Sequence, residues 1–180
     1  MNLSGLTIGS LELTPTFDKN VTEYTATTEN ATNKVTATAE SESAEIKIEV
    51  NGVEIDNESS ASWNEGENEV IITVTNGANS KEYSVTVVRP YTLAFSPSGL
   101  TANETDGLSA ESVSITNEGA TITSVTADNE NITVSEAEGV ISVTCEDESV
   151  LTNDNLPITV TVIGTIDGIY ASGNFQITYS

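Results

Sequence analysis

The sequence predicts an all-β protein made of two tandem antiparallel β-sandwich domains. Apolar residues recur at every second position in short runs, as at Tyr83, Val85 and Val87, which share one face of an extended chain. Turn pairs such as Asn51-Gly52 separate these runs at short intervals. The chain is rich in Thr, Val and Ile, and no stretch of a dozen residues has helical spacing, so we expect almost no helix.

A domain boundary is expected at the centre of the chain, at Pro90. Proline cannot donate to a strand ladder, so it ends the run that contains Tyr83. A second alternating run begins at once with Tyr91. Because the 180 residues divide into halves of about 90, each long enough for a core of its own, we predict domains at 1–90 and 91–180.

The first half is predicted to contain about seven short strands. Gly5, Gly9 and Pro15 interrupt the stretch from Leu3 to Asp18, which favours an edge strand with a bulge. The alternating runs that follow lie at 21–28, 34–39, 45–50, 53–55, 70–74 and 81–89, with turns predicted at 51–52, 64–68 and 76–77.

Six motifs occur in order along this half. They are Leu3-x-x-Leu6, Leu13-x-Pro15-x-Phe17-Asp18, Tyr24, Val50-Asn51-Gly52, Gly66-x-Asn68 and Tyr83-x-Val85-x-Val87-x-Arg89. Together they resemble the cadherin-like β-sandwich domain of bacterial surface and phage proteins. The resemblance implies an Ig-like sandwich used as a spacer or adhesive module, and it brings neither a catalytic residue nor the calcium ligands of cadherins.

The second half repeats the pattern of strands without repeating the sequence. Its expected strands lie at 91–95, 113–115, 122–125, 132–134, 141–145, 158–162 and 175–179, with turns at 106–107, 118–119, 128–129, 138–139 and 167–168. This spacing, with the hairpin Asp167-Gly168-x-Tyr170, resembles the Ig-like domains of bacteria and phages over residues 91–180. The predicted fold class is therefore all-β, with two tandem Ig-like antiparallel sandwiches.

Acidic residues dominate the charge of the chain: there are 28 acids, five bases and no histidine, for a net charge of -23. All five bases lie in the first half beside 15 acids, for a net charge of -10, whereas the second half has 13 acids and no base. Such a surface repels nucleic acid phosphates and anionic lipid, so we expect neither as a partner. The alternative is a solvated acidic exterior with no specific role.

Catalytic residue sets are largely absent from the composition. Without histidine, Ser-His-Asp and Cys-His relays and the usual zinc and copper sites cannot form. No glycine-rich phosphate loop is present. A pair of carboxylates could act as in glycosidases, but among 28 acids any chosen pair is arbitrary. We predict no enzymatic activity and no cofactor.

Calcium is the metal that the sequence allows, because it binds clustered oxygen atoms. The weak candidates are Asn153, Asp154 and Asn155, in a segment similar to the cadherin linker motif D-x-N-D-N-x-P, with Leu151 replacing the leading aspartate. The alternative is a polar turn before the strand that starts at Ile158. Two further acidic stretches, 128–131 and 146–148, also cluster oxygen ligands.

Two of the nine aromatic residues are candidates for glycan contact. The other seven fall where core is expected: Phe17, Tyr24, Tyr83, Tyr91, Phe95, Phe175 and Tyr179. Trp63 and Tyr170 remain, and an exposed ring beside hydroxyl groups can stack on a sugar; core or turn packing is the alternative. The single cysteine, Cys145, excludes an internal disulfide and is expected to be a small core residue.

These observations lead us to expect a non-enzymatic structural protein of a bacteriophage virion: a capsid decoration, fibre or tail-surface subunit. It would dock on a repeating lattice of other virion proteins or copies of itself, with the less acidic first half as the docking side, and contact a host-surface glycan. A strand pattern that begins near Met1, without an export signal, supports synthesis in a cytoplasm. The alternatives are an adhesin or stalk fragment of a bacterial cell-surface protein, which is extracellular, and a calcium- or glycan-binding module.

Overall fold

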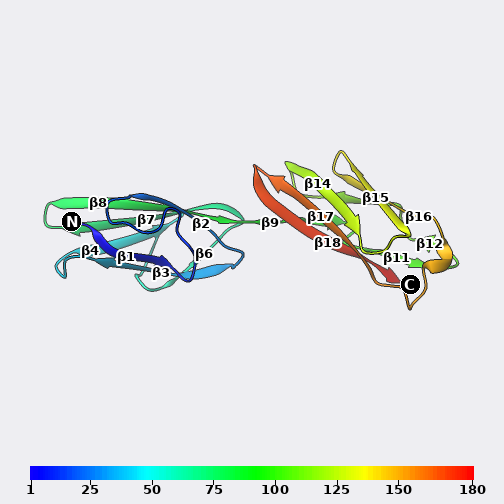
Figure 1. The fold of residues 1–180 in the computed structure, drawn as a ribbon, viewed down its shortest axis with the longest axis horizontal. Coiled ribbons are helices and arrows are strands. Elements are labelled where there is room, and N and C mark those ends of the chain that lie inside the picture. The colour runs from blue at the N-terminus through cyan, green and yellow to red at the C-terminus, as the bar shows by residue number, and fades with distance from the viewer. The chain divides into compact units, whose positions relative to one another are not determined.

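The computed structural model describes residues 1–180, which divide into two compact units, Met1–Pro90 and Tyr91–Ser180. Each unit has a hydrophobic core formed by its own residues. Strands make up the secondary structure apart from one 3₁₀ turn, η1 (Glu148–Val150), so the all-β prediction is confirmed (Figure 1).

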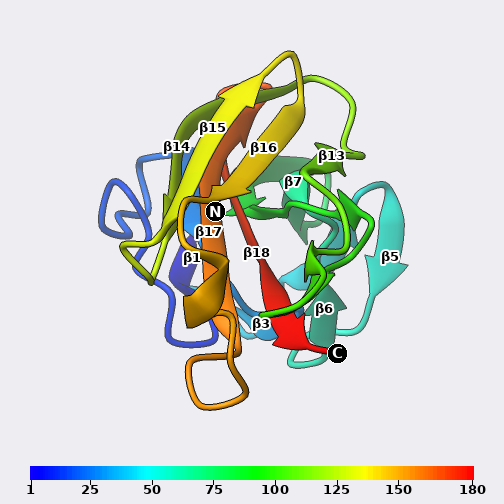
Figure 2. The same cartoon turned by 90° about the vertical axis from the view of Figure 1, so that its right-hand side faces the viewer.

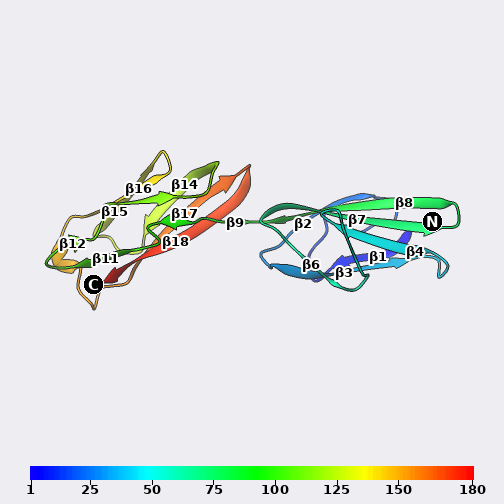
Figure 3. The same ribbon diagram turned by 180° about the vertical axis from the view of Figure 1, so that it is seen from behind.

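Two sheets form the first unit (Figure 3). A three-stranded sheet has the order β1-β3-β6, and a five-stranded sheet has the order β2-β8-β7-β4-β5. The strands are β1 (Leu3–Ile8), β2 (Glu23–Thr27), β3 (Thr32–Ala39), β4 (Glu45–Val50), β5 (Val53–Ile55), β6 (Ser60–Ser62), β7 (Gly66–Asn76) and β8 (Asn79–Arg89). All pairs are antiparallel except β2 with β8, which run parallel.

Local sequence signals explain most of these elements. Tyr83, Val85 and Val87 on β8 are fully buried, as their alternation predicted. The predicted edge strand with a bulge is β1, whose register with β3 shifts between Leu3 and Gly5. Asn51-Gly52 joins β4 to β5 with both residues at positive φ, 49° and 77°, as a type I′ turn requires.

The turn predicted at 64–68 is shorter than expected, because β7 already begins at Gly66. Gly66 pairs with Arg89, and Asn68 pairs with Val87. The Asn68 side chain completes the turn from within the strand, since its Oδ1 accepts a hydrogen bond from the backbone N of Asn64 at 2.9 Å. A side chain therefore takes the place of backbone turn residues.

The second unit also has two sheets (Figure 2). One has the order β10-β13-β16-β15, and the other has the order β12-β11-β18-β17-β14 with β9 also paired to β18. The strands are β9 (Tyr91–Thr92), β10 (Phe95–Ser96), β11 (Leu100–Asn103), β12 (Gly107–Leu108), β13 (Ser112–Ile115), β14 (Ala120–Ala127), β15 (Ile132–Ala137), β16 (Val140–Cys145), β17 (Ile158–Ile166) and β18 (Ile169–Tyr179).

The single strand expected at 91–95 is wrong, because the chain changes sheets within it. β9 pairs with β18, whereas β10 pairs with β13 in the opposite sheet. Leu93 is buried at the crossing, and its backbone passes so close to Gly173 that a Cβ there would lie 2.6 Å from the Leu93 oxygen. Only glycine allows this approach. Strands β11 and β12 were also missed, since two to four residues are too short to show a period.

Tyr179 does not belong to the core, contrary to prediction, and it is 43% exposed. It follows Phe175 and Ile177 on the same side of β18, but the ladder with β17 ends at the pair Ile158 and Ile177. The ring therefore extends past the end of β17, and only β11, in which Ala102 pairs with Tyr179, still flanks it. A nearby carboxylate, Glu104, raises the pKa of the Tyr179 hydroxyl by charge repulsion.

The separate cores predict separate effects on stability. Phe175→Ala removes a buried ring from the second core and should lower the free energy of unfolding of that unit by about 3–5 kcal/mol. Trp63, the only tryptophan, lies in the first core, so its fluorescence transition in urea should be unchanged while the circular dichroism transition shifts. Ile72→Ala is the matched control and should shift the Trp63 transition. Equal shifts of that transition in both variants would contradict the assignment.

Candidate functional site

The polar residues of the sequence motifs bind one another and the backbone. The side-chain nitrogen of Asn51 donates to Oδ1 of Asn68 at 2.9 Å, and Oδ1 of Asn51 accepts from the backbone N of Glu69 at 2.9 Å. Asn68 is only 1% exposed, and its Nδ2 donates to the carbonyl of Asn64 at 2.9 Å. Buried amide groups need hydrogen-bond partners, and this network supplies them within the domain. It therefore stabilises the fold, and its donors and acceptors are already used for that purpose.

The motif tyrosines hold the loop that precedes β2. The Tyr24 hydroxyl donates to the carbonyl of Asp18 at 2.6 Å, and the Tyr83 hydroxyl donates to the carbonyl of Lys19 at 2.8 Å. Tyr83 also accepts a hydrogen bond from the backbone N of Leu3 at 3.2 Å. Burial raises the pKa of Tyr24, as expected for a neutral phenol held in a core. Both residues have structural roles.

Trp63 cannot serve as a sugar-stacking platform, and its interpretation as a glycan contact is wrong. The side chain is 4% exposed, and its Nε1 donates to Oδ1 of Asn33 at 2.9 Å. The backbone carbonyl of Trp63 accepts from the Arg89 guanidinium at 3.1 Å. Both ring faces are covered because the residue follows β6 into the core. The alternative reading, core packing, is the one that the structure shows.

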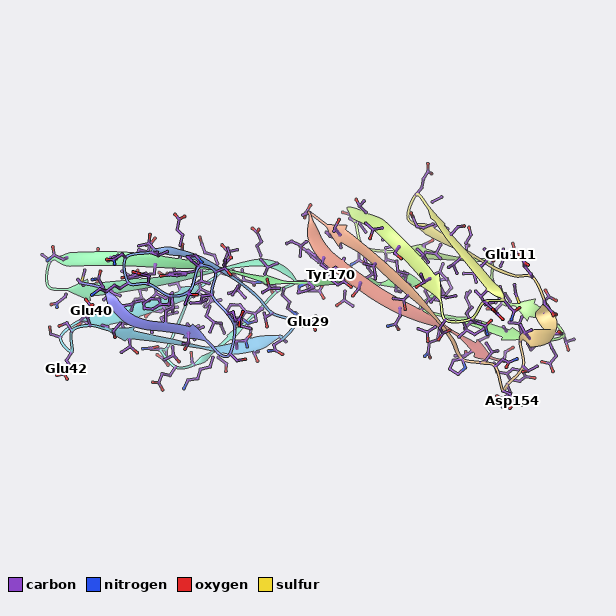
Figure 4. The ribbon with its side chains drawn as sticks, viewed as in Figure 1. Glu29, Glu40, Glu42, Glu111, Asp154 and Tyr170 are labelled. Carbon is purple, nitrogen blue, oxygen red and sulfur yellow. The ribbon has the colours of Figure 1, made fainter.

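Tyr170, by contrast, is 49% exposed (Figure 4). It follows the Asp167-Gly168 turn, in which both residues have positive φ, 53° and 80°. Directly opposite Tyr170 on β17 is Thr165, and opposite Thr165 on β14 is the exposed Thr121. Residues opposite one another share a face of the sheet, so an aromatic ring lies in a row with two hydroxyl groups. Glycan contact through Tyr170 stays a prediction.

The calcium candidates lie in an exposed loop between η1 and β17 (Figure 4). The Asn155 amide nitrogen donates to the carbonyl of Val150 at 2.9 Å, which ties that side chain to its own loop. Leu151, in the position of the leading aspartate of the cadherin motif, is fully buried in the core. No group of three or more His, Cys, Asp or Glu side chains is placed to hold a metal ion. A calcium site at Asn153, Asp154 and Asn155 is a prediction from the sequence only.

Residues 4–90 match the family of the cadherin-like beta sandwich domain. The resemblance of the first half is thereby confirmed, over a span that contains every motif residue described above except Leu3. Domains of this kind are typically non-catalytic structural or adhesion modules. No curated protein matches the sequence.

Solved structures similar to the chain include tandem Ig domains. The I-band fragment I67–I69 of titin is 11% identical with a TM-score of 0.38, and the match covers 99% of this chain and 66% of the fragment. The titin Ig tandem A164–A165 is 11% identical with a TM-score of 0.31, covering 99% of this chain and 97% of that one. The four N-terminal Ig domains of Dscam1 isoform 1.9 are 10% identical with a TM-score of 0.36, covering 97% and 47%.

The five bases are engaged within the cadherin-like domain. Lys19, Lys34 and Lys47 form ion pairs with carboxylates, with closest distances of 2.7, 3.3 and 3.0 Å to Glu40, Glu58 and Glu49. The Lys81 ammonium donates to the Lys19 carbonyl and lies 4.7 Å from the centre of the Tyr83 ring. The 13 carboxylates of residues 91–180 have no basic side chain in that unit. Its negative field is therefore not neutralised internally.

Shallow hollows occur on both units. One of them, of about 660 Å³, lies beside Leu6 and residues 11–17, whose half-buried Leu11, Leu13 and Phe17 already pack on the core. A hollow of about 230 Å³ in the second unit includes Cys145, whose thiol is half-buried and donates to the carbonyl of Asp147 at 3.3 Å. Cys145 thus packs at the margin of the core. No helix is long and apolar enough to cross a membrane.

Asn68→Ala should destabilise the cadherin-like domain by about 2–4 kcal/mol, because it removes the hydrogen bonds of the buried Asn68 amide to the carbonyls of Asn64, Gly66 and Val87. The measurement is the urea midpoint of the Trp63 fluorescence. Glu67→Ala, an exposed change one residue away, is the control and should shift stability by less than about 0.5 kcal/mol. Equal effects of the two changes on the urea midpoint would contradict a stabilising role for the Asn51–Asn68 network.

The Glu40 carboxyl should titrate below its ordinary pKa of 4.5, because Lys19 and then Asn2 donate hydrogen bonds to its ionised form. A lowered pKa in the folded state stabilises the fold above the unfolded value, and this contribution is lost as the pH falls through the folded value. NMR titration measures it directly, and Lys19→Met should move the pKa of Glu40 upward. An unchanged pKa in that variant would show that the ion pair does not persist in solution.

Proposed function

We propose that this chain is a non-enzymatic structural protein of a bacteriophage virion, a capsid decoration, fibre or tail-surface subunit. The observation that carries the proposal is how the polar residues of the cadherin-like motifs are used. Four of these residues use their hydrogen bonds to hold loops to the sheets: Asn51, Asn68, Tyr24 and Tyr83. The polar groups of these four residues thus maintain the fold. We take this use of the motifs to favour a structural role in an assembly over catalysis.

Docking on a repeating lattice is the mechanism we propose, with the cadherin-like domain toward the lattice. Its net charge is -10 and it contains every base, whereas residues 91–180 have 13 acids and no base. An acidic neighbour would therefore repel the second domain more strongly. Many copies on one particle would make weak contacts of Tyr170 with a host-surface glycan useful through avidity.

An adhesin or stalk fragment of a bacterial cell-surface protein is the second candidate. It is favoured by the match of residues 4–90 to a kind of domain that typically serves as a structural or adhesion module. In this role the same two sandwiches would space a binding domain away from a cell wall. Neither role requires a cofactor, nucleic acid or membrane as partner.

Fractionation distinguishes the two candidates. Quantitative mass spectrometry should find the chain at tens or more copies per particle in gradient-purified virions from a culture that produces it, as expected for a lattice-bound protein. In the cell-wall fraction it should be absent. Recovery only from the cell wall, as part of a longer polypeptide, would overturn the virion proposal in favour of the adhesin. Fractions of uninfected cells are the control.

A further inference from the structure

The outer edge of β14 pairs with no other strand, although β15 of the other sheet contacts β14. We call its free backbone groups from Ala120 to Ala127 the β14 edge. This eight-residue strand ends the order of its sheet and pairs only with β17 on its inner side (Figure 2). Its sequence, Ala-Thr-Ile-Thr-Ser-Val-Thr-Ala, contains no charge and no proline. Open N–H and C=O groups on such a strand are a template for pairing with another extended chain.

Other edges of the two units are shorter, bulged, covered or charged. β5 has three residues and includes Glu54, which pairs with Lys47. The backbone of Thr14 bonds to that of Thr25 in both directions at 2.8 Å and covers β2. β1 is bulged, β6 has three residues, β10 and β12 have two each, and β15 contains Glu136. The other edge strands are thus protected in one of these ways. The only such feature of β14 is one bulge, between Ile122 and Ser124.

Charge around the β14 edge selects the occupant. Exposed Glu118 precedes the strand and exposed Glu130 follows it, and the second unit contains no base. Asp167 also lies at the Glu118 end, because Ala120 pairs with Ile166. A second copy added antiparallel would bring the acidic ends of both copies together, with no base to offset them. An uncharged strand with basic residues at its ends would instead place opposite charges beside Glu118 and Glu130, which a second copy of this chain cannot do.

We propose that the β14 edge binds an extended segment of a different protein, rich in β-branched residues and with Lys or Arg at its ends. Main-chain hydrogen bonds to β14 supply affinity, and Glu118 and Glu130 select the basic ends. The exposed Thr121, Thr123 and Thr126 side chains would extend as rows onto the added strand. The inference goes beyond virion docking and does not depend on it.

A synthetic nine-residue peptide of alternating Thr and Val with Lys at both ends is the probe. Hydrogen exchange of the full chain should show the amides of β14 slowed by at least about tenfold at saturating peptide, with the amides of β8 unchanged. The same peptide with its central residue replaced by proline should give no protection, because it lacks a central N–H. Unslowed β14 amides, or equal protection by the proline peptide, would overturn the proposal.

Charge variants test the choice of partner. Glu118→Lys and Glu130→Lys should each weaken binding of the peptide about three- to tenfold. The control is Glu111→Lys, which makes the same change in net charge at a distance from β14 and should weaken binding less (Figure 4). Equal binding of a peptide with Glu ends would overturn the basic partner. Sedimentation of the chain alone tests the other occupant. If it shows a concentration-dependent dimer that Thr123→Lys abolishes, the β14 edge binds a second copy of this chain instead.

Discussion

A long antiparallel hairpin stabilises the centre of each unit, and the rest of the fold depends on it. In the first unit β7 and β8 pair from Gly66 with Arg89 to Asn76 with Asn79, and in the second β17 and β18 pair from Ile158 with Ile177 to Ile166 with Ile169. The inward residues of these strands are almost all inaccessible to solvent. Burial of those residues drives folding. Other strands extend the sheet of each hairpin on both sides, and the second sheet of each unit packs on it through the shared core.

This arrangement leaves little of the molecule for chemistry. The buried polar groups, Asn68 above all, are bonded to backbone atoms that would otherwise lack partners, and no buried side-chain nitrogen or oxygen is left without one. The carboxylates lie mostly at exposed positions, where water solvates them and no base in the second unit opposes them. The surface features that such a protein offers to a partner are the charge of its two halves, the exposed Tyr170 and the β14 edge.

Sequence patterns predicted the features that a strand encodes by itself. Period-2 alternation predicted the buried face of β8, and positive-φ residues predicted the turns at Asn51-Gly52 and Asp167-Gly168. The same reasoning failed for Trp63, which lies outside any alternating run, so that nothing nearby in sequence shows what covers its ring. It failed also for Tyr179, where alternation gives the correct side of the strand but not the point at which the neighbouring strand ends.

By itself, then, the sequence determined the fold class, the faces of the long strands, the excess of negative charge and the lack of histidine chemistry, because each is a property of local pattern or composition. Only the tertiary structure decided which strands are neighbours and which lie at an edge. The sheet change at Leu93, the burial of Trp63 and the open side of β14 all follow from pairing between residues far apart in the chain. Strand pairing of this kind leaves no period in the sequence, since it depends on the partner strand as much as on the strand itself.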